Sequence, residues 1–229
     1  MIKPTKLTTD PGGFFITGTD TEIGKTYISC ALARGFRQQG LSVIPRKPIA
    51  SGCIWQQGQL VSEDALALKA AAASQEALSK ICPYQFEAAI SPARAIKQAG
   101  KNILINDLVQ ACQTESAGLV LVEGAGGFYS PIALDGLNAD LAEQLALPII
   151  LVVGNRLGCI NHALLTIEAV KARQLKLHSI IINDLSPEAD QDNAKDLQAL
   201  CDYPVISSPY STQTELNLSL PLCSVLATK

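Results

Sequence analysis

Residues 13–26 read GFFITGTDTEIGKT, and this stretch decides the fold that the sequence predicts. Residues 14–17 form a short apolar run of β-prone residues between glycines, which predicts a buried strand. A polar loop, then Gly24-Lys25-Thr26, and then a helical pattern follow it. Backbone N–H groups at such a strand–loop–helix junction bind phosphate oxygens, aided by the positive end of the helix dipole. The stretch therefore predicts a nucleotide site.

Two residues of this stretch carry the chemistry of a phosphate-binding loop. We expect Lys25 to reach the β- and γ-phosphates of a nucleotide, and the Thr26 hydroxyl to hold Mg²⁺. The spacing departs from the usual GxxxxGK[ST] pattern, because Thr19 stands where that pattern has glycine and Gly18 comes one residue early. An ordinary strand–helix turn that happens to carry Gly-Lys-Thr is the alternative. The place of these residues at the predicted strand-to-helix junction favours the nucleotide site.

Length and charge exclude several other classes of protein. A chain of 229 residues is long enough for one α/β domain with a substantial core. We expect residues 1–229 to form a single domain that begins with a flexible segment, residues 1–12. The net charge is −3, from 18 Lys and Arg against 21 Asp and Glu, and no basic run is present. We therefore expect no nucleic-acid partner.

Cysteine usage and hydropathy predict a soluble protein of a reducing compartment. The seven cysteines are scattered, with no CxxC pair and no metal-ligand spacing, so we expect free thiols that are mostly small core residues. The first residues, MIKPTKLTTDPGG, lack the apolar segment of a signal peptide. The longest apolar run, residues 149–153, is too short to span a bilayer. The expected location is the cytoplasm, without membrane contact.

Strand and helix patterns alternate along the chain. They predict an α/β fold with a mostly parallel sheet and helices on both faces, as in P-loop NTPases. Further strands are expected at residues 42–44, 118–122, 149–153, 179–182 and 205–206. Helices are expected from Lys25 to a C-cap at Gly40, at 63–73, from 91–92 onward, and at 103–112, 138–146, 160–173 and 189–201. We expect a loop at 53–62, a short extended piece at 82–86 and an irregular tail from Ser207.

Three charged residues stand where such folds place catalytic groups. Lys47 lies between two prolines at the end of a predicted strand, and ligands bind at the carboxyl ends of strands in open α/β sheets. Glu123 ends an apolar strand and precedes the glycines of Gly124-Ala125-Gly126-Gly127, a position typical of a Mg²⁺-binding carboxylate. Asp64 lies in the first turn of a predicted helix. The alternatives are a surface lysine, a solvated glutamate in a glycine turn, and a helix cap.

Four stretches together resemble the dethiobiotin synthase family. They are GTDTEIGKT (18–26), RKPIASG (46–52), LVEGAGG (121–127) and NRLGCINHA (155–163). The motifs KPIASG and GCINHA are far more diagnostic than the phosphate-binding loop, which many NTPases share. SEDALAL (62–68), SPARA (91–95) and IIND (181–184) add to the resemblance, which extends over most of the chain.

The resemblance implies a role for each matching residue. It implies that Lys25 and Lys47 are the active-site lysines, and that Thr26, Asp64 and Glu123 hold Mg²⁺. It places the nucleotide against Glu22, Ile23, Gly24, Lys25, Thr26, Tyr27, Asp64, Glu123, Gly124, Ala125, Gly126, Asn183 and Asp184. It places the substrate against Thr21, Ser51, Gly158, Cys159 and Asn161, the last three at a helix N-terminus that suits a carboxylate. Asn183 would bind adenine, since an Asn amide pairs naturally with N6 and N7.

The activity implied by the resemblance is an ATP- and Mg²⁺-dependent ligation. The amine of 7,8-diaminopelargonate takes up CO2, the carbamate is phosphorylated by ATP, and the second amine closes the ring to give dethiobiotin, ADP and phosphate in biotin biosynthesis. The family is usually a homodimer with active sites at the subunit interface. Phosphoryl transfer needs positioning and charge neutralisation more than covalent chemistry, so we expect His162 and His178 to be structural.

The tail departs from the family pattern, which usually has a Gly-x-Ile-Pro step after its last strand. Ser207-Ser208-Pro209-Tyr210 stands there instead. Pro209, Tyr210 and Ser211 are expected to flank the base, and Glu215 to contact the ribose. Two other functions are considered. A partition- or localisation-type ATPase switch would be expected to carry a lysine near Asp20 or a basic or amphipathic surface, and another ATP-dependent amine- or carboxylate-activating ligase would lack KPIASG.

Overall fold

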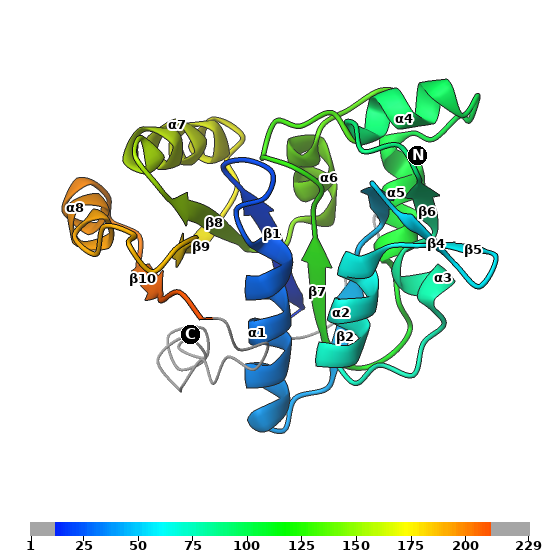
Figure 1. Cartoon of the computed structure of the whole chain (residues 1–229), viewed down its shortest axis with the longest axis horizontal. Coiled ribbons are helices and arrows are strands. Elements are labelled where there is room, and N and C mark those ends of the chain that lie inside the picture. The colour runs from blue at the N-terminus through cyan, green and yellow to red at the C-terminus, as the bar shows by residue number, and fades with distance from the viewer. Residues whose placement is uncertain (1–11, 212–229) are drawn as a thin grey trace.

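A six-stranded parallel sheet organises the molecule, in the order β10-β9-β8-β1-β7-β2. The computed structural model describes residues 12–211. The strands of this sheet are β1 (Gly13–Gly18), β2 (Val43–Arg46), β7 (Leu119–Glu123), β8 (Ile149–Asn155), β9 (Leu177–Asp184) and β10 (Val205–Ser208). Strand β1 lies between β7 and β8 and pairs in parallel with both. Because all the strands run the same way, their carboxyl ends meet at one edge, where the loop between β1 and α1 also lies (Figure 1).

Helices cover both faces of this sheet, as the sequence predicts. They are α1 (Lys25–Gln38), α2 (Glu63–Ala71), α3 (Leu78–Ile81), α4 (Pro92–Gln98), α5 (Ile105–Cys112), α6 (Asn138–Leu145), α7 (Cys159–Ala172) and α8 (Asn193–Leu200). Phe14 and Ile16 of β1 face the cluster that contains Ile28, Leu32 and Phe36 of α1. Phe15 faces the opposite cluster, to which α5, α6 and α7 contribute. This alternation explains why β1 is apolar throughout.

Strand β2 is longer than predicted and contains a proline. It runs from Val43 through Pro45 to Arg46, whereas the sequence predicted residues 42–44. Pro45 is tolerated because β2 is an edge strand that pairs with β7 alone, so the missing N–H removes no bond of the ladder. Lys47 therefore follows the last residue of an edge strand directly.

The segment between Lys47 and α4 is more regular than the sequence indicates. The predicted loop at 53–62 is a hairpin of β4 (Ile54–Gln56) and β5 (Gln59–Val61), so that prediction was wrong. Gln57 and Gly58 both have positive φ and form its turn, and glutamine gives no signal for that conformation. Strand β3 (Ile49–Ser51) pairs with β6 (Tyr84–Phe86), and the single-turn helix α3 precedes β6. Segments this short are set by packing rather than by periodicity.

Two predicted boundaries near the C-terminal end also differ. Helix α8 begins at Asn193 rather than at residue 189, because residues 185–192 form a loop whose polar groups bind the ends of β8 and β9. Strand β10 continues through Ser207 and Ser208, where an irregular tail was expected. The predictions for residues 1–11 and for Glu215 lie outside the described residues.

Candidate nucleotide and substrate site

The phosphate-binding loop closes over its own lysine. Lys25 is the first residue of α1, is buried, and donates from Nζ to the backbone carbonyl oxygen of Asp20 at 2.5 Å. Burial, together with the positive charge of Lys47, lowers the pKa of Lys25 to about 8. Gly24 has φ 87°, and a Cβ at that position would lie 2.2 Å from Nδ2 of Asn183. The loop thus requires glycine before Lys25, and it wraps the ammonium at the helix N-terminus.

Lys47 joins residues that lie far apart in the sequence. Its Nζ donates to Oε1 of Glu123 at 2.6 Å and to the carbonyl oxygen of Gly124 at 3.2 Å. The same atom lies 3.1 Å from Oδ2 of Asp64. The side chains of Lys47 and Glu123 are 4% and 0% exposed, whereas that of Asp64 is 48% exposed. Lys47 is therefore a buried ammonium between two carboxylates, and the alternative of a surface lysine was wrong.

The charges of this cluster stabilise one another. Burial alone would lower the pKa of Lys47, but the carboxylates of Glu123 and Asp64 outweigh it and raise that pKa. Burial would raise the pKa of Asp64, but Lys47 and a hydrogen bond with Thr26 hold it below its usual value. Lys47 and Asp64 are therefore both charged near neutral pH.

Local geometry frees Asp64 for this contact. Ser62 is the N-cap of α2, and its side chain accepts from the N–H of Ala65 at 3.2 Å. Because Ser62 caps the helix, Asp64 is not the cap, and its carboxylate points to Lys47. Asp64 lies in the first turn of α2, on the side that faces Thr26 at the start of α1.

Thr26, Asp64 and Glu123 converge, as the resemblance implies. The Thr26 hydroxyl donates to Oε1 of Glu123 at 2.7 Å. The other carboxylate oxygen of Glu123 is buried and has no hydrogen-bond partner within residues 12–211. No group of three His, Cys, Asp or Glu that could hold a metal by itself occurs in that part of the chain. Two carboxylates and a hydroxyl are suitable oxygen donors for Mg²⁺, provided that nucleotide phosphates supply further ligands.

The glycine-rich loop after β7 packs against the start of the phosphate-binding loop. The N–H of Phe128 donates to the carbonyl oxygen of Gly18 at 2.9 Å. Asn138, fully buried at the start of α6, donates to the carbonyl oxygens of Ala125 and Gly127 at 2.5 and 2.8 Å. A Cβ on Gly124 would lie 2.8 Å from Oδ1 of Asn138, and one on Gly126 2.4 Å from Oγ of Ser130. The glycines therefore allow the side chains of Asn138 and Ser130 to pack closely against the backbone of this loop.

Residues predicted to contact the base gather at the ends of β9 and β10. Asn183 donates from Nδ2 to the carbonyl oxygen of Ile23 at 3.1 Å, which places it against the phosphate-binding loop. Asp184 is also buried, but its two oxygens accept from Asn155 at 2.6 Å and from Gln191 at 2.8 Å. Its contact with a nucleotide stays a prediction.

Tyr27 and the last described residues lie near this base region. Burial raises the pKa of Tyr27, and the side chain of Ser211 opposes that shift, so these two residues are neighbours. Pro209 and Tyr210 are exposed just after β10. Glu22 is exposed with φ 55°, and Ile23 is buried behind the loop.

The residues predicted to hold substrate occupy two separate places in the chain's own fold. Thr21 is exposed in the phosphate-binding loop, and Ser51 ends β3 four residues after Lys47. Gly158 is the N-cap of α7 with φ 88°, and a Cβ there would meet nothing within 4 Å. Asn161 is exposed in the first turn of α7, whereas Cys159 is buried beside Asn155.

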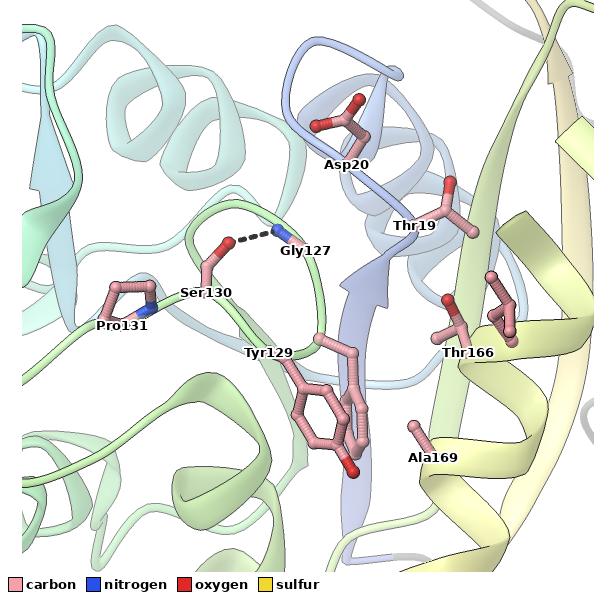
Figure 2. A pocket seen from close by; sticks show the side chains of 10 residues that line it. Thr19, Asp20, Gly127, Tyr129, Ser130, Pro131, Thr166 and Ala169 are labelled. Carbon is pink, nitrogen blue, oxygen red and sulfur yellow. Dashed lines mark hydrogen bonds between the residues drawn. The ribbon is translucent and has the colours of Figure 1, made fainter. Parts of the chain in front are cut away.

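A pocket of about 540 Å³ lies between the phosphate-binding loop, the loop after β7 and the outer side of α7. Figure 2 shows Asp20 and Thr19 above Thr166 and Ala169 of α7, and Tyr129 to the left of that helix. Ser130 accepts from the N–H of Gly127 at 2.8 Å at its rim. Tyr129 and Leu165 are 50% and 63% exposed, so this side of the molecule carries apolar surface.

Comparison with known proteins decides the family. Residues 12–214 match the family model described as an AAA domain. An ATP-dependent dethiobiotin synthetase from Aromatoleum aromaticum is 41% identical over 203 residues, which cover 86% of this chain and 90% of the relative. One from Anaeromyxobacter dehalogenans is 39% identical over 180 residues, which cover 78% and 79%. The chain belongs to the dethiobiotin synthetase family.

Solved structures of other proteins have the same fold. A ParA family ATPase from Chlorobium tepidum matches with a TM-score of 0.52 at 12% identity, over 89% of this chain and 86% of that one. The MinC:MinD cell division protein complex of Aquifex aeolicus matches with a TM-score of 0.53 at 13% identity, over 88% and 82%. At such low identity these matches show the fold alone, and it is the P-loop NTPase-like fold that the sequence predicted. Within residues 12–211, no helix has the length and apolar character needed to cross a membrane.

The structure adds site residues that sequence reasoning missed. Asn138 and Ser208 bind other site residues, and Arg156 pairs through Nη2 with Oδ2 of Asp20 at 2.7 Å. Asn155 links the ends of β8 and β9 through Asp184. Asn155 and Arg156 lie within NRLGCINHA, so that motif gave a signal for them. Asn138 and Ser208 gave none, because their partners are remote in sequence.

Proposed function

We propose that the chain is an ATP-dependent dethiobiotin synthetase of biotin biosynthesis. It would combine 7,8-diaminopelargonate with CO2 and ATP, and release dethiobiotin, ADP and phosphate. The observation that carries this proposal is the buried ammonium of Lys47 between Glu123 and Asp64, beside the loop that holds Lys25. Membership of the dethiobiotin synthetase family supports the choice of substrate.

The two lysines suit a reaction in which negative charge moves between oxygens. One amine of the substrate adds to CO2 and forms a carbamate. A carbamate oxygen attacks the γ-phosphorus, and ADP leaves. The second amine attacks the carbamoyl carbon, expels phosphate and closes the ring. Lys25 would hold the phosphates of ATP, and Lys47 would neutralise the carbamate or the transferred phosphoryl group.

Mg²⁺ would be held by Thr26, Asp64 and Glu123 and would neutralise charge on the phosphates. The buried, unpartnered oxygen of Glu123 supports this assignment, because a buried carboxylate oxygen calls for a cation or a donor. Asn183 would bind the adenine base and Tyr27, Pro209, Tyr210 and Ser211 would lie around it. Thr21 and Ser51 would contact the diamine.

We also propose a cytoplasmic homodimer in which α7 of one subunit completes the site of the other. Asn161 and Gly158, at the N-terminus of α7, would bind the substrate carboxylate of the partner's site. Exposed apolar side chains around this helix support the proposal. Leu157 is 102% exposed, and Tyr129 and Leu165 flank the adjacent pocket. Such surface is typical of a protein–protein contact.

The test of this function uses ¹³C-labelled bicarbonate, the diamine, ATP and Mg²⁺. We expect mass spectrometry to find labelled dethiobiotin in an amount equal to the ADP formed, and we expect ADP release to depend on the diamine. A matched reaction with a mono-amino analogue of the diamine should give no ring product. ATP hydrolysis that is indifferent to the diamine would contradict the proposal and favour an ATPase switch. Diamine-independent activation of another amine or carboxylate would favour a different ligase.

A further inference from the structure

The side chain of Asn183 is held from two sides. Its Nδ2 donates to the carbonyl oxygen of Ile23 at 3.1 Å. Its Oδ1 accepts from the hydroxyl of Ser208 at 3.2 Å. Asn183 is 4% exposed and Ser208 is fully buried. The two residues are direct neighbours in the register of β9 and β10, so the backbone brings them together at the carboxyl edge of the sheet.

The Ile23 carbonyl determines which way the amide faces, and the bond from Ser208 holds it in that plane. The carbonyl oxygen of Ile23 can only accept, so it requires the NH₂ group of Asn183 on its side. Ser208 then donates to the opposite oxygen and holds the plane of the amide. The packing is tight on the loop side, because a Cβ at Gly24 would lie 2.2 Å from Nδ2. Turning the amide over would place its oxygen against the carbonyl oxygen of Ile23, two acceptors facing each other, whereas the Ser208 hydroxyl could then accept from the NH₂ group.

One N–H and one acceptor position of this amide remain after both bonds are made. That pair matches the 6-amino group and N7 of adenine, which offer a donor and an acceptor side by side. Guanine and hypoxanthine carry an oxygen at position 6, so both groups facing the amide would be acceptors. An amide locked in this orientation would place its own acceptor against that oxygen.

We propose that Ser208 is a positioning residue for base selection, which locks the Asn183 amide so that the site accepts adenine and rejects 6-oxopurines. The inference rests on the proposed use of ATP and on the proposed role of Asn183. Ser208 itself does not contact the base. Its hydroxyl acts through Asn183, and its loss would leave the amide held by the Ile23 carbonyl alone.

The test measures the dissociation constants of non-hydrolysable ATP and GTP analogues, with Mg²⁺, for the wild-type chain and for variants. In Ser208→Ala we expect the preference for the ATP analogue to fall by roughly three- to tenfold, the value of one neutral hydrogen bond. Ser208→Thr keeps a hydroxyl and should retain the wild-type preference for the ATP analogue. Ser207→Ala is the matched control, because Ser207 is the exposed neighbour on the same strand and should leave the preference unchanged.

If Ser208→Ala weakens the binding of both analogues equally, or leaves the ratio of their dissociation constants unchanged, Ser208 only supports the strand. Either result would overturn the proposal. Where Ser208→Ala does not fold, as judged by circular dichroism, Ser208→Cys takes its place, since a thiol is close in size and only a weak donor. The ratio of dissociation constants does not depend on ring closure. A chain that prefers ATP through Ser208 but makes no dethiobiotin would refute the proposed function and keep this inference.

Discussion

Lys47 shows how much of the site depends on a single side chain. Its ammonium is almost completely removed from water, and the carboxylates of Glu123 and Asp64 hold it in the charged form. An ammonium in this setting is a fixed positive charge, suited to an anion that forms and moves during reaction. The same burial makes the residue structurally important, because Glu123 is wholly buried beside it.

We predict that Lys47→Met reduces the turnover of dethiobiotin formation at least 100-fold, about 2.7 kcal/mol in activation free energy. The dissociation constant of ATP should change by less than about threefold, because Lys25 and the backbone loop hold the phosphates. Steady-state kinetics and calorimetric titration measure the two effects. Lys97→Met, at an exposed position of α4, is the matched control. Near-normal turnover in Lys47→Met would contradict a catalytic role.

The same substitution should lower the free energy of unfolding by about 3–5 kcal/mol, since it leaves the buried carboxylate of Glu123 without its partner. The double variant Lys47→Met, Glu123→Gln should recover part of that loss and none of the activity. Chemical denaturation gives the comparison. Recovery of both stability and turnover in the double variant would mean that the loss of turnover comes only from unfolding.

The lowered pKa of Lys25 predicts that nucleotide binding depends on pH. In the free chain, burial lowers its pKa from 10.5 to about 8, and bound phosphates would favour the charged form and raise it again. Binding should therefore take up a proton, and the affinity for ATP should fall as the pH rises above about 8. The free energy of unfolding of the free chain should change in the opposite sense, because the unfolded state binds more protons between pH 8 and 10.5.

Titration calorimetry in buffers of different ionisation enthalpy measures the proton uptake. Lys25→Arg is the control, because its guanidinium stays charged across this range and should remove the proton uptake. A wild-type affinity that stays constant from pH 7 to 9.5 would show that the Lys25 ammonium does not bind the phosphates.

Three elements each contribute one group to the proposed metal site. Thr26 comes from α1, Asp64 from α2 and Glu123 from the end of β7. Strand β1 and the phosphate-binding loop bring α1 beside β7, and helix α2 packs on α1. The donors converge only because the sheet and both helices have docked.

We predict that Glu123→Gln and Asp64→Asn each raise the Mg²⁺ concentration for half-maximal activity, by roughly tenfold or more, because each removes a charged oxygen ligand. Titration of activity with Mg²⁺ at saturating ATP measures the change. Glu63→Gln is the matched control for Asp64, as the exposed residue beside it on α2. An unchanged Mg²⁺ requirement in Glu123→Gln would leave Glu123 as the partner of Lys47 alone.

The elements could be predicted from the sequence to different degrees. The apolar strands β1, β7, β8 and β9 and the amphipathic helix α1 follow from periodicity, because burial on both faces or on one stripe leaves a strong pattern. The β4–β5 hairpin and α3 do not, because segments of three or four residues carry too little pattern. Glu123 could be placed at a strand end. Its contact with Lys47 could not, because that contact spans 76 residues of sequence.

At the scale of the whole molecule, the residues expected to bind substrate lie in two groups. Thr21 lies in the phosphate-binding loop and Lys47 and Ser51 follow β2, whereas Gly158 and Asn161 open α7 on a separate βα unit. Sequence motifs can show that both groups belong to one function. Whether they serve one site within a chain or across two chains depends on an assembly that the motifs do not encode.

We predict complementation between two inactive variants, Lys47→Ala and Asn161→Ala. If α7 completes the partner's site, a mixed dimer has one site with both defects and one intact site. Random re-association of equal amounts makes about half of the dimers mixed, so activity should return to roughly one quarter of the wild-type value. Native mass spectrometry with mass-labelled chains verifies the exchange. Verified exchange without recovered activity would place Asn161 in its own chain's site or in none.

The strand order also has a consequence for how the chain folds as it is synthesised. Strand β1 ends at residue 18, but its two neighbours, β7 and β8, begin only at residues 119 and 149. At ~5–20 residues per second, the ribosome needs roughly 5–20 s to make the 100 residues between β1 and β7. Through that interval the apolar strand β1 has neither of the two strands with which it pairs. Nascent chains of this protein should therefore depend on chaperones that bind short apolar segments, until β7 leaves the exit tunnel.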